Sequence, residues 1–212
     1  MSDNHPQDPL VTLLEEDEVF RQGSLSVLSA KLQYRRSDGQ MSEPQPRRCV
    51  ERGDAVGVLV FDPVDESVVL VRQFRYPVYS RLDEGARRGA GAREAWLLEI
   101  AAGMQEHGQS AEETARREVS EEIGYDISGP LERIATVYTT PGFVSERITL
   151  YLAELPPNSE RGAGGGLVEE GEDTALVRLP AAEAWVMVER GEICDAKTVI
   201  ALQHLRLKLL RG

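Results

Sequence analysis

The sequence contains little cysteine and little histidine. Its 212 residues include two cysteines, Cys49 and Cys194, and three histidines. Two cysteines so far apart form neither the spacing of a zinc site nor a disulfide framework. The scarcity of histidine argues against a His-based catalytic triad and against a zinc site built on several His.

Long apolar runs are also lacking, and no stretch approaches the length that spans a membrane. The start of the chain has neither the basic nor the apolar region of a signal peptide. We therefore expect a cytoplasmic protein that does not bind membranes. The chain length suits one domain with a full hydrophobic core and room for a small appendage.

Positive charge is scarce as well, with 24 basic against 36 acidic residues and a net charge of -12. Such a surface repels polyanions, so we expect no nucleic acid and no anionic membrane among its partners. An acidic enzyme that acts on a phosphorylated substrate must neutralise that substrate locally. Metal ions and clustered arginines are the two usual means.

Alternating hydrophobicity over residues 11–20 and 25–35 predicts strands, because successive side chains of a strand point to opposite faces, and short apolar runs later in the first half predict more. Residues 37–40 form a turn signal that should fold the second strand back in a hairpin. Residues 81–94 are rich in glycine and charge, which predicts a mobile insertion. The predicted strands of this half cover residues 11–20, 25–35, 54–61, 68–75 and 96–101.

The second half begins with a predicted helix over residues 111–123. Ser110 and Glu113 form a capping box at its start, and Gly124 provides the stop. Asp195 is placed to cap a later helix. The remaining predictions are strands over residues 131–139, 146–153 and 175–179 and helices over 181–190 and 196–210. This order of elements predicts a mixed α/β sandwich.

Residues 162–166 include four glycines and precede an acidic loop. The run is not a phosphate-binding P-loop, because no Gly-Lys-Ser/Thr sequence follows it. We interpret it as a hinge that lets residues 169–173 close over a site.

Three carboxylates crowd one edge of the predicted helix over residues 111–123. At about 100° per residue, Glu118 and Glu122 lie within roughly 40° of each other, and Glu121 is beside them. Like charges four residues apart repel, which makes sense if a divalent cation lies between them. The adjoining apolar stripe consists of Ala111, Ala115, Val119 and Ile123.

The alternative is a solvated surface helix stabilised by ion pairs. Three acid–base combinations have the i,i+4 spacing that such pairs require. They are Glu112–Arg116, Glu113–Arg117 and Arg117–Glu121.

The whole segment resembles the Nudix box, whose pattern is Gly, five residues, Glu, seven residues, then Arg-Glu-aliphatic-any-Glu-Glu-any-Gly-aliphatic. Tyr125 takes the last aliphatic place. Gln109 departs from the pattern, because the family has glutamate there as a supporting residue near the box arginine. We therefore expect Gln109→Glu to be tolerated and to pair with the box arginine. The residues in register are Gly103, Arg117, Glu118, Val119, Glu121, Glu122 and Gly124.

The resemblance implies the Nudix α/β/α sandwich, an α/β fold with a mixed sheet between helices. We expect the Nudix hydrolase domain over residues 51–212. In the ADP-ribose pyrophosphatase and GDP-mannose hydrolase branch of this family, N-terminal strands usually build a homodimer. Residues 1–50 are therefore expected to form a β-rich dimerisation region.

The similarity is greatest to the ADP-ribose pyrophosphatase and GDP-mannose hydrolase branch. Residues 51–54, 71–76 and 139–146 and the acidic loop carry it, while residues 191–198 look more like the GDP-mannose side. The candidate substrate-binding residues are Arg52, Arg75, Arg72, Phe74 and Glu146. A guanidinium suits phosphate oxygens. The alternative is that the arginines are merely exposed at strand ends and that Phe74 is a core aromatic.

The implied reaction is hydrolysis of the pyrophosphate bond of a nucleoside diphosphate sugar, with Mg²⁺ as cofactor and Mn²⁺ as the alternative. The expected metal ligands are Glu118, Glu122, the carbonyl of Ala102 and Glu172. Glu121 supports them, and Glu170 is the expected general base. The alternatives are hydrolysis of another derivative, such as a dinucleoside polyphosphate, and a non-catalytic Nudix-fold binding domain.

Overall fold

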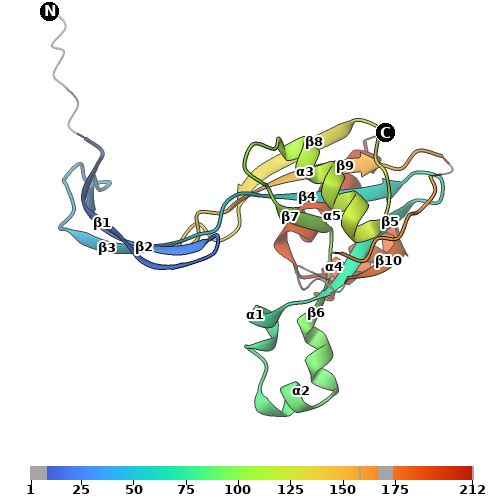
Figure 1. The fold of residues 1–212 in the computed structure, drawn as a ribbon, viewed down its shortest axis with the longest axis horizontal. Helices are drawn as coiled ribbons and strands as arrows, with labels where there is room; N and C mark the ends of the chain where they lie inside the picture. The colour runs from blue at the N-terminus through green and yellow to red at the C-terminus, as the bar shows by residue number, and fades with distance from the viewer. Residues whose placement is uncertain (1–8, 158, 167–173, 212) are drawn as a thin grey trace, which may run out of the picture. The chain divides into compact units, whose positions relative to one another are not determined.

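The computed structural model describes residues 9–157, 159–166 and 174–211. The chain divides into two compact units (Figure 1). The first comprises Met1–Gly53 and Thr140–Glu146, and the second comprises Asp54–Thr139 and Arg147–Gly212. The division thus falls at Gly53, and the first unit takes in a segment that the sequence did not assign to it.

The first unit is built on an antiparallel sheet of order β1-β2-β3. The predicted hairpin is confirmed, because β2 pairs with β3 beyond a turn in which Arg36 donates to the carbonyl of Gln40. Large apolar side chains of β1 remain exposed, including Leu13, Val19 and Phe20. The strands are β1(Val11–Gln22), β2(Leu25–Tyr34) and β3(Gln45–Glu51).

The second unit contains a seven-stranded mixed sheet whose main path is β10-β5-β4-β9-β8. β4 and β9 run parallel, and every other pairing is antiparallel. The strands are β4(Ala55–Asp62), β5(Ser67–Phe74), β6(Trp96–Glu99), β7(Ala101–Met104), β8(Leu131–Tyr138), β9(Arg147–Glu154) and β10(Ala175–Pro180).

A segment is inserted where β4 and β5 separate. These two strands pair only near the turn that joins them, from Val60 to Asp62 on β4. Farther along, β5 pairs with β6 and β4 pairs with β7. The strand predicted over residues 96–101 is therefore two strands, which change partner at Ile100.

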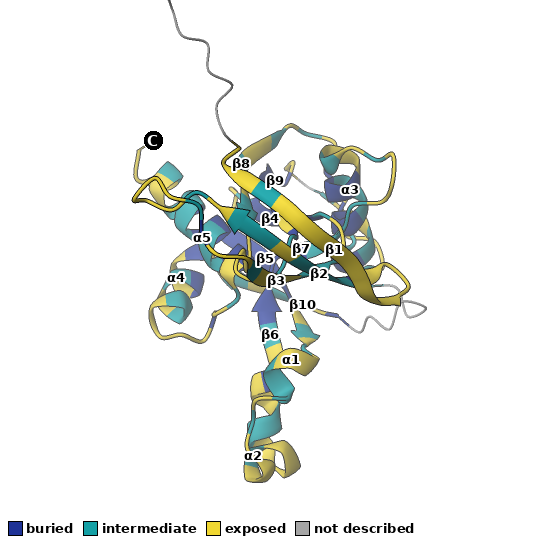
Figure 2. Ribbon diagram, turned by 90° about the vertical axis from the view of Figure 1, so that its left-hand side faces the viewer, coloured by how far each residue is buried: buried dark blue, intermediate teal, exposed yellow. Residues whose placement is uncertain are grey.

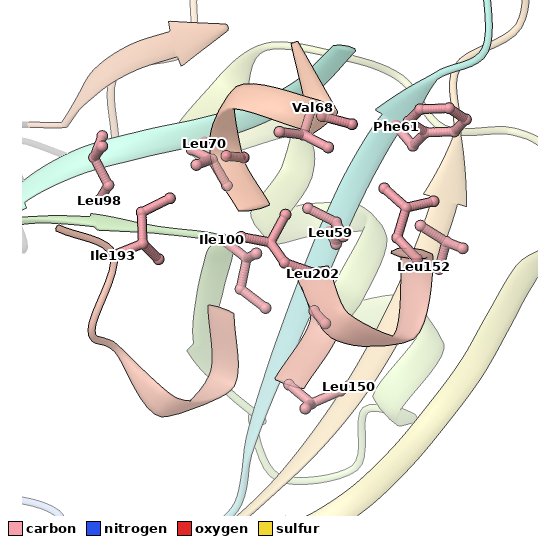
Figure 3. Packing of buried hydrophobic residues seen from close by; sticks show 14 of the residues in the cluster. Leu59, Phe61, Val68, Leu70, Leu98, Ile100, Leu150, Leu152, Ile193 and Leu202 are labelled. Carbon is pink, nitrogen blue, oxygen red and sulfur yellow. The ribbon is translucent and has the colours of Figure 1, made fainter. Parts of the chain in front are cut away.

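Helices cover both faces of this sheet, so each face has its own core. Odd-numbered residues of β4, such as Leu59, pack against α4(Ala181–Glu189) and α5(Ala196–Leu209) (Figure 3). Even-numbered residues, such as Val58, pack against α3(Ala111–Glu118). Figure 2 shows the buried centre of the sheet between the helices. The predicted α/β/α sandwich with a mixed sheet is confirmed.

Residues 81–94, expected to be a mobile insertion from their glycine and charge, lie within a segment of short helices over residues 76–95. The segment forms α1(Tyr76–Tyr79), α2(Glu84–Arg88) and the 3₁₀ helix η1(Ala90–Ala95). The carboxylate of Asp83 accepts a hydrogen bond from the backbone N–H of Ala86, which caps α2. Among the described residues, no helix combines the length and apolar character needed to cross a membrane.

Candidate active site

The helix that carries the box carboxylates has the ends that the sequence predicts. Ser110 and Glu113 make the reciprocal capping box at the start of α3. Gly124 ends the helical segment in the left-handed conformation, with φ of 76°. A residue with a Cβ would be strained there.

The last turn is wider than an α-helix. Residues Val119–Ile123 form a π-helical turn, and the N–H of Gly124 donates to the carbonyls of Val119 and Ser120 at 3.1 Å each. Single π turns are rare overall, but those that occur are frequently found at functional sites. This turn carries Glu121 and Glu122, and no sequence feature predicted it.

Glu118 and Glu122 are both buried and lie against the backbone of β7. The N–H of Ala102 donates to the Glu122 carboxylate at 3.1 Å. Gly103 lies so close to Glu118 that a Cβ there would overlap its carboxylate. The structure therefore brings together Ala102, Glu118 and Glu122, the three described residues expected to hold a metal.

Arg117 holds two of the box carboxylates together. Its guanidinium pairs with Glu118 and with Glu121 at 2.7 Å each. Burial alone would lower the pKa of Arg117, but the charges of Glu118 and Glu121 outweigh burial and raise it. Of the three i,i+4 pairs considered, Arg117–Glu121 forms. Arg116 donates instead to the carbonyls of Ile127 and Gly129, so the helix is not a simple ion-paired surface helix.

The hydrogen bonds of the Gln109 side chain go to Glu106 and Thr114 and not to the box arginine, Arg117. The Gln109 amide donates to Glu106 at 3.0 Å and accepts from the hydroxyl of Thr114 at 3.1 Å. Glu106 is the residue of this group that approaches Arg117, at 3.9 Å. The expected pairing of a glutamate at position 109 with Arg117 therefore has little support.

The residues present fit a hard divalent cation, although the described part of the chain holds no group of three His, Cys, Asp or Glu side chains arranged for a metal. Two buried carboxylates meet strand backbone where Gly103 leaves space for one of them. Mg²⁺ prefers such oxygen donors and retains several waters. Glu170 and Glu172 lie outside the described residues.

The glycine-rich run is attached to the end of the box helix. The N–H groups of Gly162, Gly165 and Gly166 donate to the carbonyls of Gly124, Glu122 and Glu121 at 2.6, 2.8 and 3.1 Å. These bonds satisfy carbonyls that a helix end leaves without partners. Residues 162–166 are therefore anchored to the end of the box helix, while residues 169–173, which the expected hinge would move, lie outside the described residues.

Comparison with known protein families matches the NUDIX domain to residues 51–199. The chain belongs to the NUDIX family. The matched range includes Gly103, Glu118 and Glu122, and the predicted family is confirmed.

Curated relatives match most of the chain. An ADP-ribose pyrophosphatase of Escherichia coli (strain K12) is 34% identical over 197 residues, covering 93% of this chain and 88% of the relative. A GDP-mannose pyrophosphatase of Cronobacter sakazakii is 32% identical over 195 residues, covering 92% and 95%. A crystal structure of an ADP compounds hydrolase shares the fold, with a TM-score of 0.65, 24% identity and 96% of each chain covered.

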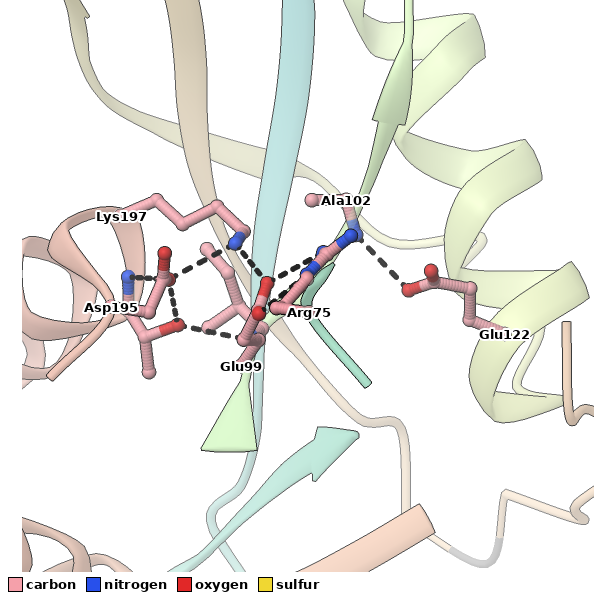
Figure 4. Close-up of polar contacts among 8 residues, drawn as sticks. Arg75, Glu99, Ala102, Glu122, Asp195 and Lys197 are labelled. Atoms are coloured by element: carbon pink, nitrogen blue, oxygen red, sulfur yellow. Dashed lines mark hydrogen bonds and ion pairs between the residues drawn. The ribbon is translucent and has the colours of Figure 1, made fainter. Parts of the chain in front are cut away.

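Three of the substrate-binding candidates of this NUDIX chain lie on or next to β5. Arg75 makes a bidentate pair with Glu99, at 2.8 and 2.7 Å (Figure 4). Arg72 is exposed and forms no ion pair within the described part of the chain. Phe74 is half-exposed and packs on Trp96, with ring centroids 5.0 Å apart.

The other two candidates, Arg52 and Glu146, meet within the first unit. The Nε of Arg52 lies 3.1 Å from the Glu146 carboxylate. The segment that carries Glu146 is held by backbone bonds between Val50 and both Phe143 and Ser145. Residues almost a hundred positions apart thus form one charged pair.

Sequence reasoning missed the partners of Arg75. Glu99 is buried and also binds Lys197, which pairs with Asp195 at 3.0 Å. The only sequence signal was the similarity of residues 191–198 to GDP-mannose hydrolases, which assigned no role to either charge.

Proposed function

We propose that this NUDIX chain hydrolyses the pyrophosphate bond of a nucleoside diphosphate sugar, with ADP-ribose and GDP-mannose as leading substrates. The observation that carries the proposal is the pair of buried carboxylates, Glu118 and Glu122, against the backbone of β7. The names of the relatives, ADP-ribose pyrophosphatase and GDP-mannose pyrophosphatase, support the substrate class. The products are a nucleoside monophosphate and a sugar phosphate.

Mg²⁺ is the proposed cofactor, with Mn²⁺ as the alternative. Glu118, Glu122 and the carbonyl of Ala102 would hold it, with Glu172 as a further contact. Bound divalent cations polarise phosphate oxygens and lower the pKa of a coordinated water. Glu121 supports the site through Arg117, because that guanidinium pairs with both Glu121 and Glu118.

Arg52, Arg72, Arg75, Phe74 and Glu146 are the proposed substrate contacts. An acidic chain needs cations where a pyrophosphate binds, and three of these residues are arginines. A guanidinium offers paired donors to phosphate oxygens. Phe74 presents an exposed ring that suits base stacking, and the Glu146 carboxylate suits sugar hydroxyls.

Glu170 is the proposed general base, a choice that the resemblance to the family implies; histidine is scarce, and the acidic loop supplies carboxylates. Loss of a positioned base costs on the order of 10²–10⁴-fold in turnover. Turnover of Glu170→Gln should fall by that amount with little change in substrate affinity. Glu172→Gln should instead raise the Mg²⁺ concentration that gives half-maximal rate. A nearly unchanged turnover for Glu170→Gln rejects the assignment.

A hydrolysis panel tests the proposed function. Release of nucleoside monophosphate is measured from ADP-ribose, GDP-mannose, ADP-glucose, NADH and a dinucleoside polyphosphate, with Mg²⁺ or Mn²⁺. Glu118→Gln and Glu122→Gln should each lose most activity and keep the fold, because each removes one charged ligand oxygen. Cleavage of the dinucleoside polyphosphate alone, or nucleotide binding without cleavage, contradicts the proposal.

We further propose a cytoplasmic homodimer assembled through residues 1–50. Exposed apolar side chains on β1, including Leu13, Val19 and Phe20, support an assembly role for this region. Cell fractionation tests the location, and sedimentation tests the assembly.

A further inference from the structure

The first turn of α5 binds the chain between β6 and β7, where the strand partner changes from β5 to β4. Ile100 lies between β6 and β7, and its N–H donates to the hydroxyl of Thr198 at 2.9 Å. Asp195 caps the helix and accepts from both the N–H and the hydroxyl of Thr198, at 3.0 and 2.6 Å. This turn therefore fixes the backbone between Glu99 and the metal-site residue Ala102.

Four charges surround this point and balance one another (Figure 4). Glu99 pairs with both Arg75 and Lys197, and Lys197 also pairs with Asp195. Burial alone would raise the pKa of Glu99. The hydrogen bonds and charges of Arg75 and Lys197 outweigh burial, so its pKa lies below the ordinary value. Glu99 thus stays ionised with two cations in contact.

Arg75 is the most exposed member of the group. Its side chain is 38% exposed, against 10% for Lys197 and 2% for Glu99. Its pKa is raised chiefly by the hydrogen bonds to Glu99, with added effects from the charges of Asp195 and Glu122. Arg75 therefore lies within the field of a candidate metal ligand and can move toward solvent, whereas Lys197 is buried beside Glu99.

We propose that Lys197 is a positioning residue: it keeps Glu99 neutralised so that Arg75 can turn its guanidinium from Glu99 to a substrate phosphate. This inference rests on the proposed function. A carboxylate left buried and unpaired is strongly unfavourable. Without Lys197, Arg75 could bind phosphate only by leaving Glu99 in that state, so substrate binding would weaken.

The test compares Lys197→Met, Lys197→Arg and the double variant Glu99→Gln/Lys197→Met. The substrate is whichever of ADP-ribose and GDP-mannose the wild type hydrolyses faster. We expect Lys197→Met to raise KM roughly tenfold, with kcat within about threefold. Lys197→Arg, which keeps the charge, and the double variant, which removes the anion together with its cation, should both restore KM.

Binding in EDTA gives a readout that does not depend on turnover. The Kd of the same substrate, measured calorimetrically without metal, should follow the KM values across the variants. Thermal unfolding of each variant shows whether the fold is kept. Lys208→Met is the matched control, because Lys208 also lies on α5 but pairs with Glu132 and Glu154. Its KM should equal that of the wild type.

A purely structural role for Lys197 predicts a different pattern. Lys197→Met would then lower the unfolding temperature and kcat without raising KM or Kd, and the double variant would restore nothing; this result overturns the inference. If Lys197→Met does not fold, Glu99→Gln replaces it. We then expect a substrate affinity at least equal to that of the wild type. A tenfold weaker affinity would overturn the proposal. Failure of the wild type to cleave either substrate refutes the proposed function instead.

Discussion

Gly103 shows how residue-level packing shapes the candidate metal site. The residue faces the carboxylate of Glu118 so closely that even a methyl group would overlap it. The obstructing atoms are the end of a flexible side chain, so an added methyl displaces the carboxylate more readily than the backbone. Glycine at this position thus serves the geometry of the ligand.

We predict that Gly103→Ala keeps the fold and loses activity. Displacement of a reacting or ligating group by about 1 Å can cost on the order of 10²-fold in rate. Steady-state turnover at limiting Mg²⁺ measures the effect. Gly129→Ala is the control, because a Cβ there meets no atom within 4 Å. Equal turnover for both variants would show that activity does not depend on the exact position of the Glu118 carboxylate.

Gln109 is a second residue whose substitution the structure reinterprets. Gln109→Glu would place a carboxylate at hydrogen-bond distance from Glu106 instead of pairing with Arg117. We predict a loss of a few tenths of a kcal/mol in the free energy of unfolding, since like charges then face each other. Urea unfolding should show a smaller loss at high salt. Stabilisation by this substitution would support the Arg117 pairing after all.

At the scale of elements, the glycine-rich run and the box helix behave as one structure. Two backbone N–H groups of residues 162–166 donate to carbonyls of the π turn that carries Glu121 and Glu122, and a third donates to Gly124 just after it. A Cβ on Gly164 would lie 2.8 Å from the carbonyl carbon of Ile123, so no other residue allows this approach. The cap therefore fixes the end of the helix that bears two box carboxylates.

We predict that Gly164→Ala destabilises the protein and lowers its activity. Overpacking typically costs about 1–3 kcal/mol. Gly23→Ala is the matched control, because its φ of +59° equals that of Gly164 at +57° within two degrees, but nothing lies within 4 Å of its Cβ. Urea unfolding should show the larger loss for Gly164→Ala. Equal losses would mean that backbone strain alone acts and that the close packing has no effect.

At the scale of the whole molecule, the first unit is a thin sheet that has little core of its own. Large apolar side chains stay exposed along it, from Leu10 to Leu25. Exposed apolar patches of this kind commonly mark protein–protein interfaces. A second copy of the chain is the partner that the proposed function assigns to this surface.

We predict that the full-length chain sediments as a dimer at micromolar concentration. Deletion of residues 1–48 should give a monomer with a higher KM, because Val50, which holds the segment that carries Glu146, would lose its partner strand β2. Analytical ultracentrifugation and steady-state kinetics measure the two effects. A full-length monomer at that concentration refutes the dimer.

The sequence by itself determined the fold class and the chemistry of the box. Period-two alternation predicted β1 and β2, short apolar runs predicted β4 and β5, and the capping box and Gly124 set the ends of the box helix within a residue or two. These features are local, because each depends on residues only a few positions apart. The spacing of Glu118 and Glu122 is also a local feature, and the structure places both residues against β7.

Tertiary structure decided which charges far apart in the sequence meet, whereas the Arg117–Glu121 pair follows from i,i+4 spacing. Arg75 binds Glu99, and Arg52 binds Glu146, across separations that no spacing rule covers. The glycine run appeared flexible from composition, yet its N–H groups find helix carbonyls about forty residues earlier in the chain. Such partners depend on how the strands and helices pack, and therefore on contacts between residues far apart in the sequence.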